Sequence, residues 1–104
     1  MPGLSLSLGE SALRDLEELR RWYGEQGVAE VGERFVVEIL QRVEDLVHHP
    51  DIGRVVPEFG QPVLRELIHP PFRAVYRCEL GRVRVVRIWR SERLLRLPTE
   101  DGQR

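Results

Sequence analysis

Apolar and hydroxyl side chains alternate strictly near the start of the chain, in the run LSLSL of residues 4–8. A period of two is typical of a strand with one buried face. Ser7 and Glu10 then have the spacing of a capping box, in which each side chain binds a free backbone N–H of the other residue. The pattern therefore predicts a short strand followed directly by the start of a helix.

Two apolar stripes with helical spacing follow this strand. The first consists of Ala12, Leu16, Leu19 and Tyr23, and the second consists of Val31, Phe35, Ile39, Val43 and Leu46, widened by Val36, Leu40 and Val47. Gly24 and Gly27 are expected to end the first helix, and Pro50 the second, because a proline pushes the preceding residue out of helical geometry. The short connection makes the two helices antiparallel neighbours, which is a helical hairpin.

Three strand-like runs occupy the second half of the chain: VLRELI at 63–68, FRAVYRCEL at 72–80 and RVRVVRIW at 82–89. Gly81 is expected at the tip of a tight hairpin. The last run has apolar residues at both odd and even positions, so on both faces of the strand, which is typical of an interior strand. The order β-α-α-β-β-β predicts an α+β fold, with the helical hairpin packed on one face of a small, mainly antiparallel sheet. The other face has no helix to cover it and carries arginines, so functional residues are expected there.

The length predicts one domain over residues 1–104, with 1–3 and 97–104 expected to fray. No apolar run approaches the ~18–20 residues that cross a membrane, and the N-terminus has no basic residue before its leucines, unlike a secretion signal. The single cysteine, Cys78, rules out an intramolecular disulfide and fits a reducing compartment. We therefore expect a cytoplasmic protein without membrane contact.

A net charge of −1 conceals a strong asymmetry along the chain. Residues 10–51 contain eleven acidic residues and five arginines, a balance of −6, whereas residues 65–96 contain nine arginines and three glutamates, a balance of +6. The chain has no lysine, so every cation is a guanidinium, which suits carboxylate or phosphate partners. The asymmetry suggests an acidic or phosphate-bearing partner.

The residue types that hold metals or carry nucleophilic chemistry are sparse. His48 and His49 are adjacent, so on a helix they point about 100° apart, and His69 is distant in sequence. Cys78 falls on the apolar face of its strand and is interpreted as a small hydrophobic residue. No Gly-rich phosphate loop is present in the sequence. We predict no metal and no cofactor.

The order and spacing of several segments resemble the RelE/ParE superfamily of toxins from bacterial type II toxin–antitoxin modules, most closely its ParE-like branch. These segments are DLEELRRWY, HPDIGRVVPEFG, LRELI and FRAVYRCELGRVRVVRIWRSERLL. The most specific positions are Gly53, Arg54, Val56, Pro57, Glu58, Arg65, Glu66, Leu67, Arg73, Tyr76 and Arg77. The resemblance runs from Leu4 to about Leu95 and implies a RelE/ParE-like fold with an acidic antitoxin as partner.

The resemblance gives the proline-rich crossing at 49–62 a structural role between the second helix and the sheet. Arg54 and Glu58 are then candidates for a hydrogen-bonded pair that holds the crossing in place, although Arg54 is also a candidate for direct contact with a target. The full structural motif implied by the resemblance is Gly53, Arg54, Pro57, Glu58, Glu66 and Tyr76.

Three functions fit the resemblance. ParE-type toxins poison DNA gyrase, and the residues expected to bind target or antitoxin are Arg65, Arg73, Arg77, Arg87, Arg90 and Arg93. RelE-type toxins cut mRNA on the ribosome, and Arg73 and Arg93 would then be the catalytic candidates. Leu64 and Glu66 stand where RelE-type toxins have lysines, and Thr99 where they have a late tyrosine, so the gyrase poison is the favoured prediction. The third function is a degenerate toxin that only binds its antitoxin.

Either a dimer or a toxin–antitoxin heterotetramer is compatible with the sequence.

Overall fold

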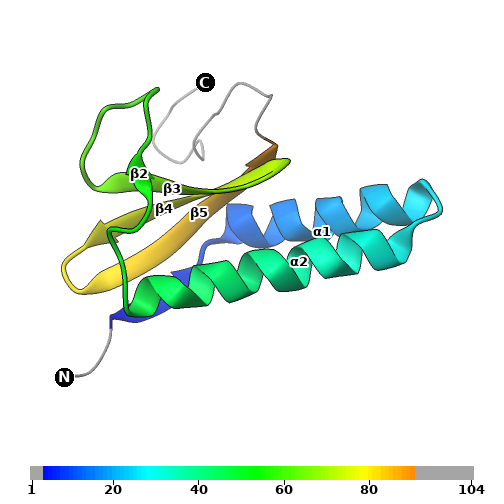
Figure 1. The fold of residues 1–104 in the computed structure, drawn as a ribbon, viewed down its shortest axis with the longest axis horizontal. Helices are drawn as coiled ribbons and strands as arrows, with labels where there is room; N and C mark the ends of the chain where they lie inside the picture. The colour runs from blue at the N-terminus through cyan, green and yellow to red at the C-terminus, as the bar shows by residue number, and fades with distance from the viewer. Residues whose placement is uncertain (1–3, 91–104) are drawn as a thin grey trace.

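The computed structural model describes residues 4–90, in which a helical hairpin lies along one side of a sheet (Figure 1). The elements are β1 (Ser5–Leu8), α1 (Glu10–Glu25), α2 (Ala29–Glu44), a 3-10 turn (Asp45–Val47), β2 (Arg54–Val55), β3 (Leu64–His69), β4 (Phe72–Glu79) and β5 (Arg82–Arg90). Neither helix in this part of the chain is long and apolar enough to span a membrane.

The described strands form one sheet with the order β1-β5-β4-β3-β2. β1 is parallel to β5, and every other neighbouring pair is antiparallel. The predicted α+β class and mainly antiparallel sheet are therefore confirmed, and β5 is the interior strand that its pattern predicted. Its hairpin with β4 turns at Leu80 and Gly81, which have φ angles of 55° and 72°, as a tight two-residue turn requires. The short β2 lies inside the crossing and was missed, because two residues carry no periodic pattern.

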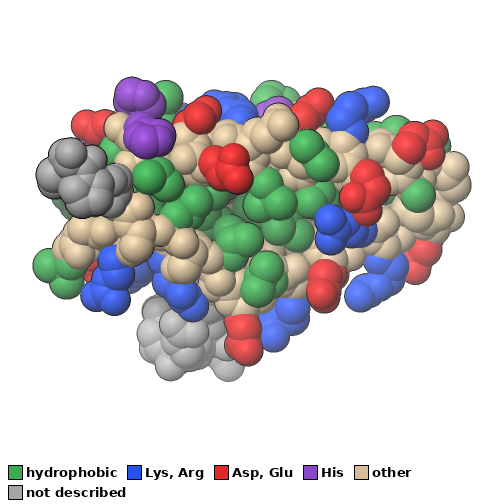
Figure 2. All heavy atoms as spheres, turned by 90° about the horizontal axis from the view of Figure 1, so that it is seen from below, with side chains coloured by type: hydrophobic (Ala, Val, Ile, Leu, Met, Phe, Trp, Pro, Cys, Tyr) green, Lys and Arg blue, Asp and Glu red, His purple; other side chains and the backbone are tan. Residues whose placement is uncertain are grey.

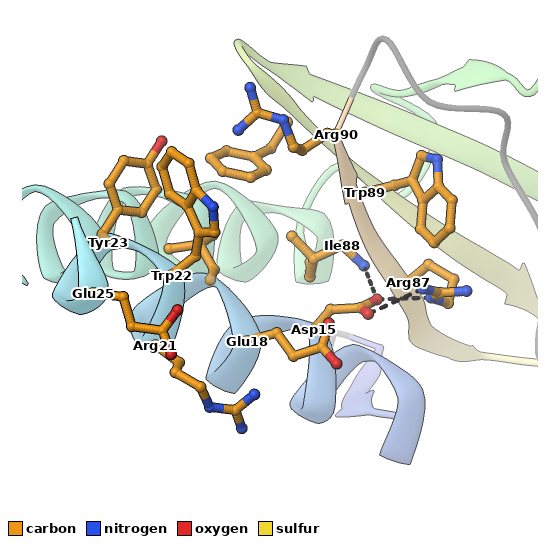
Figure 3. A pocket seen from close by; sticks show the side chains of 12 residues that line it. Asp15, Glu18, Arg21, Trp22, Tyr23, Glu25, Arg87, Ile88, Trp89 and Arg90 are labelled. Carbon is orange, nitrogen blue, oxygen red and sulfur yellow. Dashed lines mark hydrogen bonds and ion pairs between the residues drawn. The ribbon is translucent and has the colours of Figure 1, made fainter.

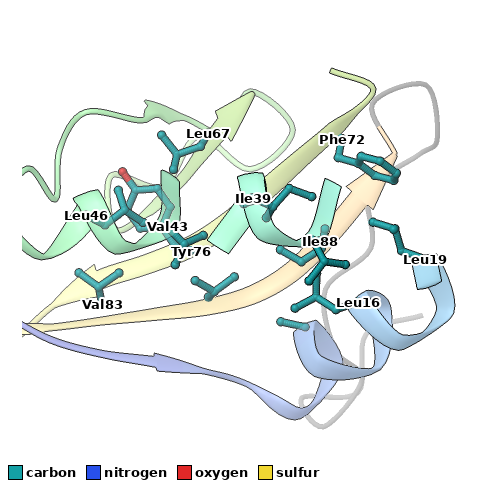
Figure 4. Packing of buried hydrophobic residues seen from close by; sticks show 14 residues of the cluster. Leu16, Leu19, Ile39, Val43, Leu46, Leu67, Phe72, Tyr76, Val83 and Ile88 are labelled. Carbon is teal, nitrogen blue, oxygen red and sulfur yellow. The ribbon is translucent and has the colours of Figure 1, made fainter. Parts of the chain in front are cut away.

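The main core lies between the hairpin and the sheet (Figure 4). Its buried residues are Ala12, Leu16 and Leu19 from α1, Val36, Ile39 and Val43 from α2, Leu46, and Leu67, Phe72, Ala74, Tyr76, Val83, Val85 and Ile88 from the strands. The two helices approach closely at Gly32, where a Cβ would lie 2.9 Å from the Cβ of Tyr23. The predicted stripe of the second helix holds at Ile39, Val43 and Leu46, whereas in its first half Val36 is buried and Phe35 only half-buried.

The beginning of α1 differs from the capping-box prediction. Ser7 belongs to β1, and the residue before the helix is Gly9, which is extended and supplies no side-chain cap. The Gly9 N–H donates to the Val85 carbonyl at 2.8 Å, so the chain stays bound to the sheet until the helix begins. The Ser7 hydroxyl accepts a hydrogen bond from Arg84 at 3.2 Å instead. The capping-box prediction was wrong because Ser7 is part of β1 and pairs with β5, so Gly9 takes the cap position.

The crossing between α2 and β3 covers part of the sheet face that carries no helix. Val56 from the crossing is buried with Leu64 and Val75 in a second, smaller cluster, and Phe59, Val63, Val86 and Trp89 pack around it. No helix covers this face, as the sequence predicted, but the crossing covers part of it. Val75 alternates with Ala74 and Tyr76 of the main core, which places the second cluster on the opposite side of β4.

Asp15 on α1 completes the edge of β5 where β1 ends. β1 pairs with β5 only as far as Val85. Further along, Asp15 accepts hydrogen bonds from the backbone N–H of Ile88 at 2.9 Å and from Arg87 at 2.7 and 3.0 Å (Figure 3). One carboxylate thus substitutes for a neighbouring strand and ties the helix to the sheet.

We predict that Asp15→Ala lowers the free energy of unfolding by about 2–3 kcal/mol, because Arg87 and the Ile88 N–H both lose this acceptor in a poorly hydrated place. Urea denaturation measures this difference. Glu18→Ala, an exposed change one turn away on the same helix, is the control and should stay within about 0.5 kcal/mol of the wild type. Equal effects of the two variants would contradict this role of Asp15.

Candidate functional site

A network of charges with a buried centre connects the crossing to the sheet face that has no helix. Arg73 on β4 donates to Glu66 on β3 at 2.8 Å and to Glu58 in the crossing. The second oxygen of Glu66 accepts from Nε of Arg54 at 2.6 Å. The side chain of Arg73 is 7% exposed and that of Glu66 is 0% exposed. We call these four residues the charge network.

The predicted pairing of Arg54 with Glu58 is wrong in its partners. Arg54 bonds Glu66, which lies directly opposite it on the neighbouring strand, and Glu58 bonds Arg73. Both residues do hold the crossing in place, each through a partner on the sheet. Sequence proximity suggested the local pair, whereas strand register sets the real one.

The charge network shifts the pKa values of Glu58 and Arg73. The hydrogen bond from Arg73 lowers the pKa of Glu58 below its ordinary value of 4.5, against the opposing effect of burial. Burial lowers the pKa of Arg73, but the bonds and charges of Glu58 and Glu66 outweigh that effect and raise it. Both partners are therefore charged at neutral pH. Within the described residues, Nε of Arg73 is buried without a hydrogen-bond partner.

Gly53 and Tyr76 form the second attachment of the crossing. The Tyr76 hydroxyl donates to the Pro50 carbonyl at 2.7 Å and accepts from the Gly53 N–H at 3.0 Å. A Cβ at Gly53 would lie 2.6 Å from both the Glu66 carbonyl and the Tyr76 hydroxyl, so the position has no room for a side chain. Burial raises the pKa of Tyr76, which keeps its hydroxyl protonated and able to donate. The exposed Pro57 lies in the crossing, next to Glu58.

The structure separates the arginines that were predicted as one binding set. Arg73 is buried in the charge network, and Arg65 donates to the Gly53 carbonyl at 2.9 Å. Arg77 is half-exposed on β4. Arg87 is bound by Asp15 and stacks over Trp89 with 4.1 Å between its Cζ and the ring centroid. Arg90 lies 5.7 Å from the ring centroid of Phe72, and Arg93 falls outside the described residues.

A groove of about 600 Å³ lies between the C-terminal half of α1 and the end of β5 (Figure 3). It is lined by Asp15, Glu18, Leu19, Arg21, Trp22, Tyr23, Glu25, Phe72, Arg87, Ile88, Trp89 and Arg90. Trp22 is 50% exposed and contacts Tyr23 edge to face. The sequence did not predict this groove, because it depends on how α1 crosses β5. The exposed aromatic Trp22 was its only sequence signal.

Apolar side chains also reach the surface of the helical hairpin. Figure 2 shows hydrophobic side chains gathered along the middle of the molecule as seen from below, with acidic and arginine side chains around them. Leu13 on α1 and Val37 on α2 are 47% and 50% exposed. A second hollow of about 360 Å³ is lined by Leu6, Ser7, Leu8, Leu40, Val43 and Glu44, beside the edge strand β1.

The histidines and the cysteine lie apart from the groove and the charge network. Within residues 4–90, no group of His, Cys, Asp and Glu side chains is arranged to hold a metal ion. His69 contacts Glu38 at 3.0 Å, and His48 and His49 are exposed. Cys78 is partly buried against the main core, as its position in the strand pattern predicted.

Comparison with known proteins gives one consistent result. Residues 6–95 match the model of the family described as "ParE toxin of type II toxin-antitoxin system, parDE". A chain of the chromosomal ParDE TA system from P. aeruginosa has a similar structure, with a TM-score of 0.73 and 26% identity over 86% of this chain and 97% of that one. A chain of the RelBE2 toxin–antitoxin complex from Mycobacterium tuberculosis has a TM-score of 0.62 and 16% identity, over 88% of this chain and 97% of that one. A search of curated protein sequences found no match.

We predict that Arg73→Met lowers the free energy of unfolding by about 3–5 kcal/mol, because it leaves the carboxylate of Glu66 buried with Arg54 alone. The double variant Arg73→Met with Glu66→Met removes the buried charge as well and should recover at least half of that loss. Denaturant unfolding measures both variants. A double variant no more stable than the single one would argue against a buried charge as the cause.

The lowered pKa of Glu58 predicts a dependence of stability on pH. Because the folded protein holds the ionised form more strongly than the unfolded chain does, Glu58 stabilises the fold at pH values above 4.5. This contribution is lost as pH falls through the lowered pKa. The difference in unfolding free energy between wild type and Glu58→Gln should therefore be constant near neutral pH and shrink in acid. Urea titrations from pH 7 to about pH 3 measure it, and an unchanged difference in acid would contradict the prediction.

Proposed function

Since the chain belongs to the ParE toxin family of type II toxin–antitoxin systems, we propose that this toxin inhibits DNA gyrase and that a cognate antitoxin neutralises it. We further propose that it acts in the bacterial cytoplasm, where gyrase is found, which agrees with its single cysteine. It binds its target through surface contacts and carries out no cleavage of its own.

The burial of Arg73 is the observation that carries this proposal. A nuclease that uses the 2′-hydroxyl of RNA needs cations that can contact the phosphate in the transition state. Arg73 is one of the two candidates for that role, but two carboxylates hold its guanidinium and its side chain is 7% exposed. Glu66, at a position where RelE-type toxins have a lysine, is the carboxylate at the centre of the charge network. Arg73 and Glu66, at two positions where a nuclease of this kind would have cations for the phosphate, here bind each other.

The surface retains features suited to binding another protein. The groove between α1 and β5 combines the exposed ring of Trp22 with arginines at its rim, including Arg21 and Arg90. Aromatic and arginine side chains are the types most often found at the energetic centres of protein interfaces. Gyrase and the antitoxin are the two partners proposed here, and a dimer or a toxin–antitoxin heterotetramer is the proposed assembly.

Purified toxin is therefore expected to inhibit the supercoiling of relaxed plasmid by bacterial DNA gyrase, and to leave mRNA intact in programmed ribosomes. In cells that express the toxin without an antitoxin, incorporation of thymidine should fall before incorporation of methionine. Measuring both labels within minutes of induction separates a primary from a secondary effect.

The converse order would overturn the gyrase proposal. If protein synthesis falls first and mRNA is cut, the RelE-like alternative holds, and Arg93→Gln should then reduce the cutting. A toxin that leaves both syntheses and supercoiling unchanged would be a degenerate toxin whose only partner is its antitoxin.

A further inference from the structure

Two arginines face each other directly across the last hairpin of the sheet. In the strand register, Arg77 on β4 is the partner of Arg84 on β5. Both point away from the helices, because their neighbours along the strands, such as Tyr76 and Val83, belong to the main core. Ser7 of β1 pairs with Arg84 on its other side, and Leu64 of β3 pairs with Arg77. The two arginines therefore occupy the middle positions of a row that crosses four strands, and the guanidinium of Arg84 is turned toward Ser7 and Gly9.

This arrangement is unfavourable for the isolated toxin. Like charges directly opposite each other on antiparallel strands destabilise a sheet. Within residues 4–90, neither arginine forms an ion pair, and Arg84 makes only a hydrogen bond to the Ser7 hydroxyl at 3.2 Å. The nearest acidic residues on this face are Glu79, two residues from Arg77 on β4 and diagonal to Arg84, and Glu66, diagonal to Arg77. Glu79 lies directly opposite Arg82, and Glu66 is held by Arg54 and Arg73.

Three other arginines on this side of the sheet each form an ion pair with a carboxylate of the toxin. Arg54 and Arg73 are bound by carboxylates of the charge network, and Arg87 is bound by Asp15. On this face the fold thus supplies a carboxylate to three arginines and leaves Arg77 and Arg84 without one among the described residues. Arg82 forms no ion pair there either, but it lies directly opposite Glu79. We propose that the missing carboxylates come from the antitoxin, and that the Arg77–Arg84 pair is the receptor for an acidic segment of it. The inference rests on the proposed function only in naming the antitoxin as the source of that segment.

The surroundings of the pair define the chemistry of the segment. Leu64 is buried beside Arg77, and the partly buried Val63 and Val86 continue the apolar surface of the second cluster. A segment that fits both features carries adjacent acidic side chains on one edge and apolar side chains on the other. Each guanidinium can then bind a carboxylate through two parallel hydrogen bonds, and the repulsion between the two arginines becomes attraction for the partner.

The same surface is poorly suited to a nucleic acid. Proteins that bind a polyanionic backbone typically make about 6–10 phosphate contacts. Here the flanking cations Arg54 and Arg73 are engaged by carboxylates of the toxin itself, and those carboxylates would repel phosphates. A peptide that brings two or three carboxylates to one point matches the pair better than a strand of regularly spaced phosphates.

The pair predicts opposite effects of one substitution on stability and on binding. Arg77→Gln and Arg84→Gln should each raise the Tm of the free toxin by about 1–4 °C, because either change removes the repulsion. The double variant should add little more, since the two changes relieve the same repulsion. Arg82→Gln is the matched control on the same strand and face. Its arginine faces Glu79, so its Tm should fall or stay unchanged. A fall in Tm for all three variants would overturn the inference.

Binding can be measured with a fluorescein-labelled poly-L-glutamate of about 20 residues, at low salt because exposed charges are screened. The expected result is binding to the wild type that weakens by about fivefold or more in Arg77→Gln and in Arg84→Gln, and that changes little in Arg82→Gln. No binding to the wild type, or equal losses in all three variants, would overturn the proposed receptor.

A single-stranded oligothymidylate of equal charge tests the alternative ligand. If it binds more tightly than the peptide and depends on the same two arginines, the occupant is a nucleic acid and the inference is wrong. The supercoiling assay on the same variants keeps the two proposals apart. Peptide binding without gyrase inhibition would refute gyrase as the target and leave the proposed receptor standing. Gyrase inhibition without peptide binding would refute the receptor and leave gyrase as the target.

Discussion

The carboxylate of Glu66 has no contact with solvent, and two guanidinium groups approach it from opposite sides, Arg54 from the crossing and Arg73 from β4. Burying a carboxylate costs several kcal/mol unless its partners and hydrogen bonds compensate. The compensation requires the crossing to lie on the sheet, because Arg54 and Glu58 reach their partners only there. One buried charge therefore fixes the path of the proline-rich segment. It also limits which side chains the sheet face without a helix can present to another molecule.

Five arginines on this face of the sheet fall into two groups according to their partners. Arg54, Arg73 and Arg87 each bind a carboxylate of the fold, so their charge is used in holding elements together. Arg77 and Arg84 stand in the neighbouring row of the same sheet without such a partner in the described part of the chain. The two groups are chemically identical in the sequence. The register of β4 against β5 and the position of Glu66 decide which arginine stabilises the fold and which is available for recognition.

Most of the architecture could be predicted from the sequence, because it depends on patterns a few residues long. Alternation at 4–8, the two helical stripes and Gly81 between two strands determine the helical hairpin and the antiparallel sheet. The pairing of Arg54 could not be predicted in this way. A local partner, Glu58, satisfies charge equally well, and the correct partner Glu66 is set by strand register. The groove between α1 and β5 also escaped prediction, since no single segment forms it.

The charge network bears directly on the choice between the two activities of the superfamily. For Arg73 to contact a phosphate, it would have to leave Glu58 and Glu66, and Glu66 would keep a buried charge with one partner removed. Breaking a buried pair in this way costs about 3–5 kcal/mol, which reduces the population of the released state by about 10²–10³-fold or more. A transition state could repay that cost only by binding Arg73 more strongly than two carboxylates do. A toxin that acts by surface contact needs no such release, and its stabilising network and its binding surface can both persist in the bound state.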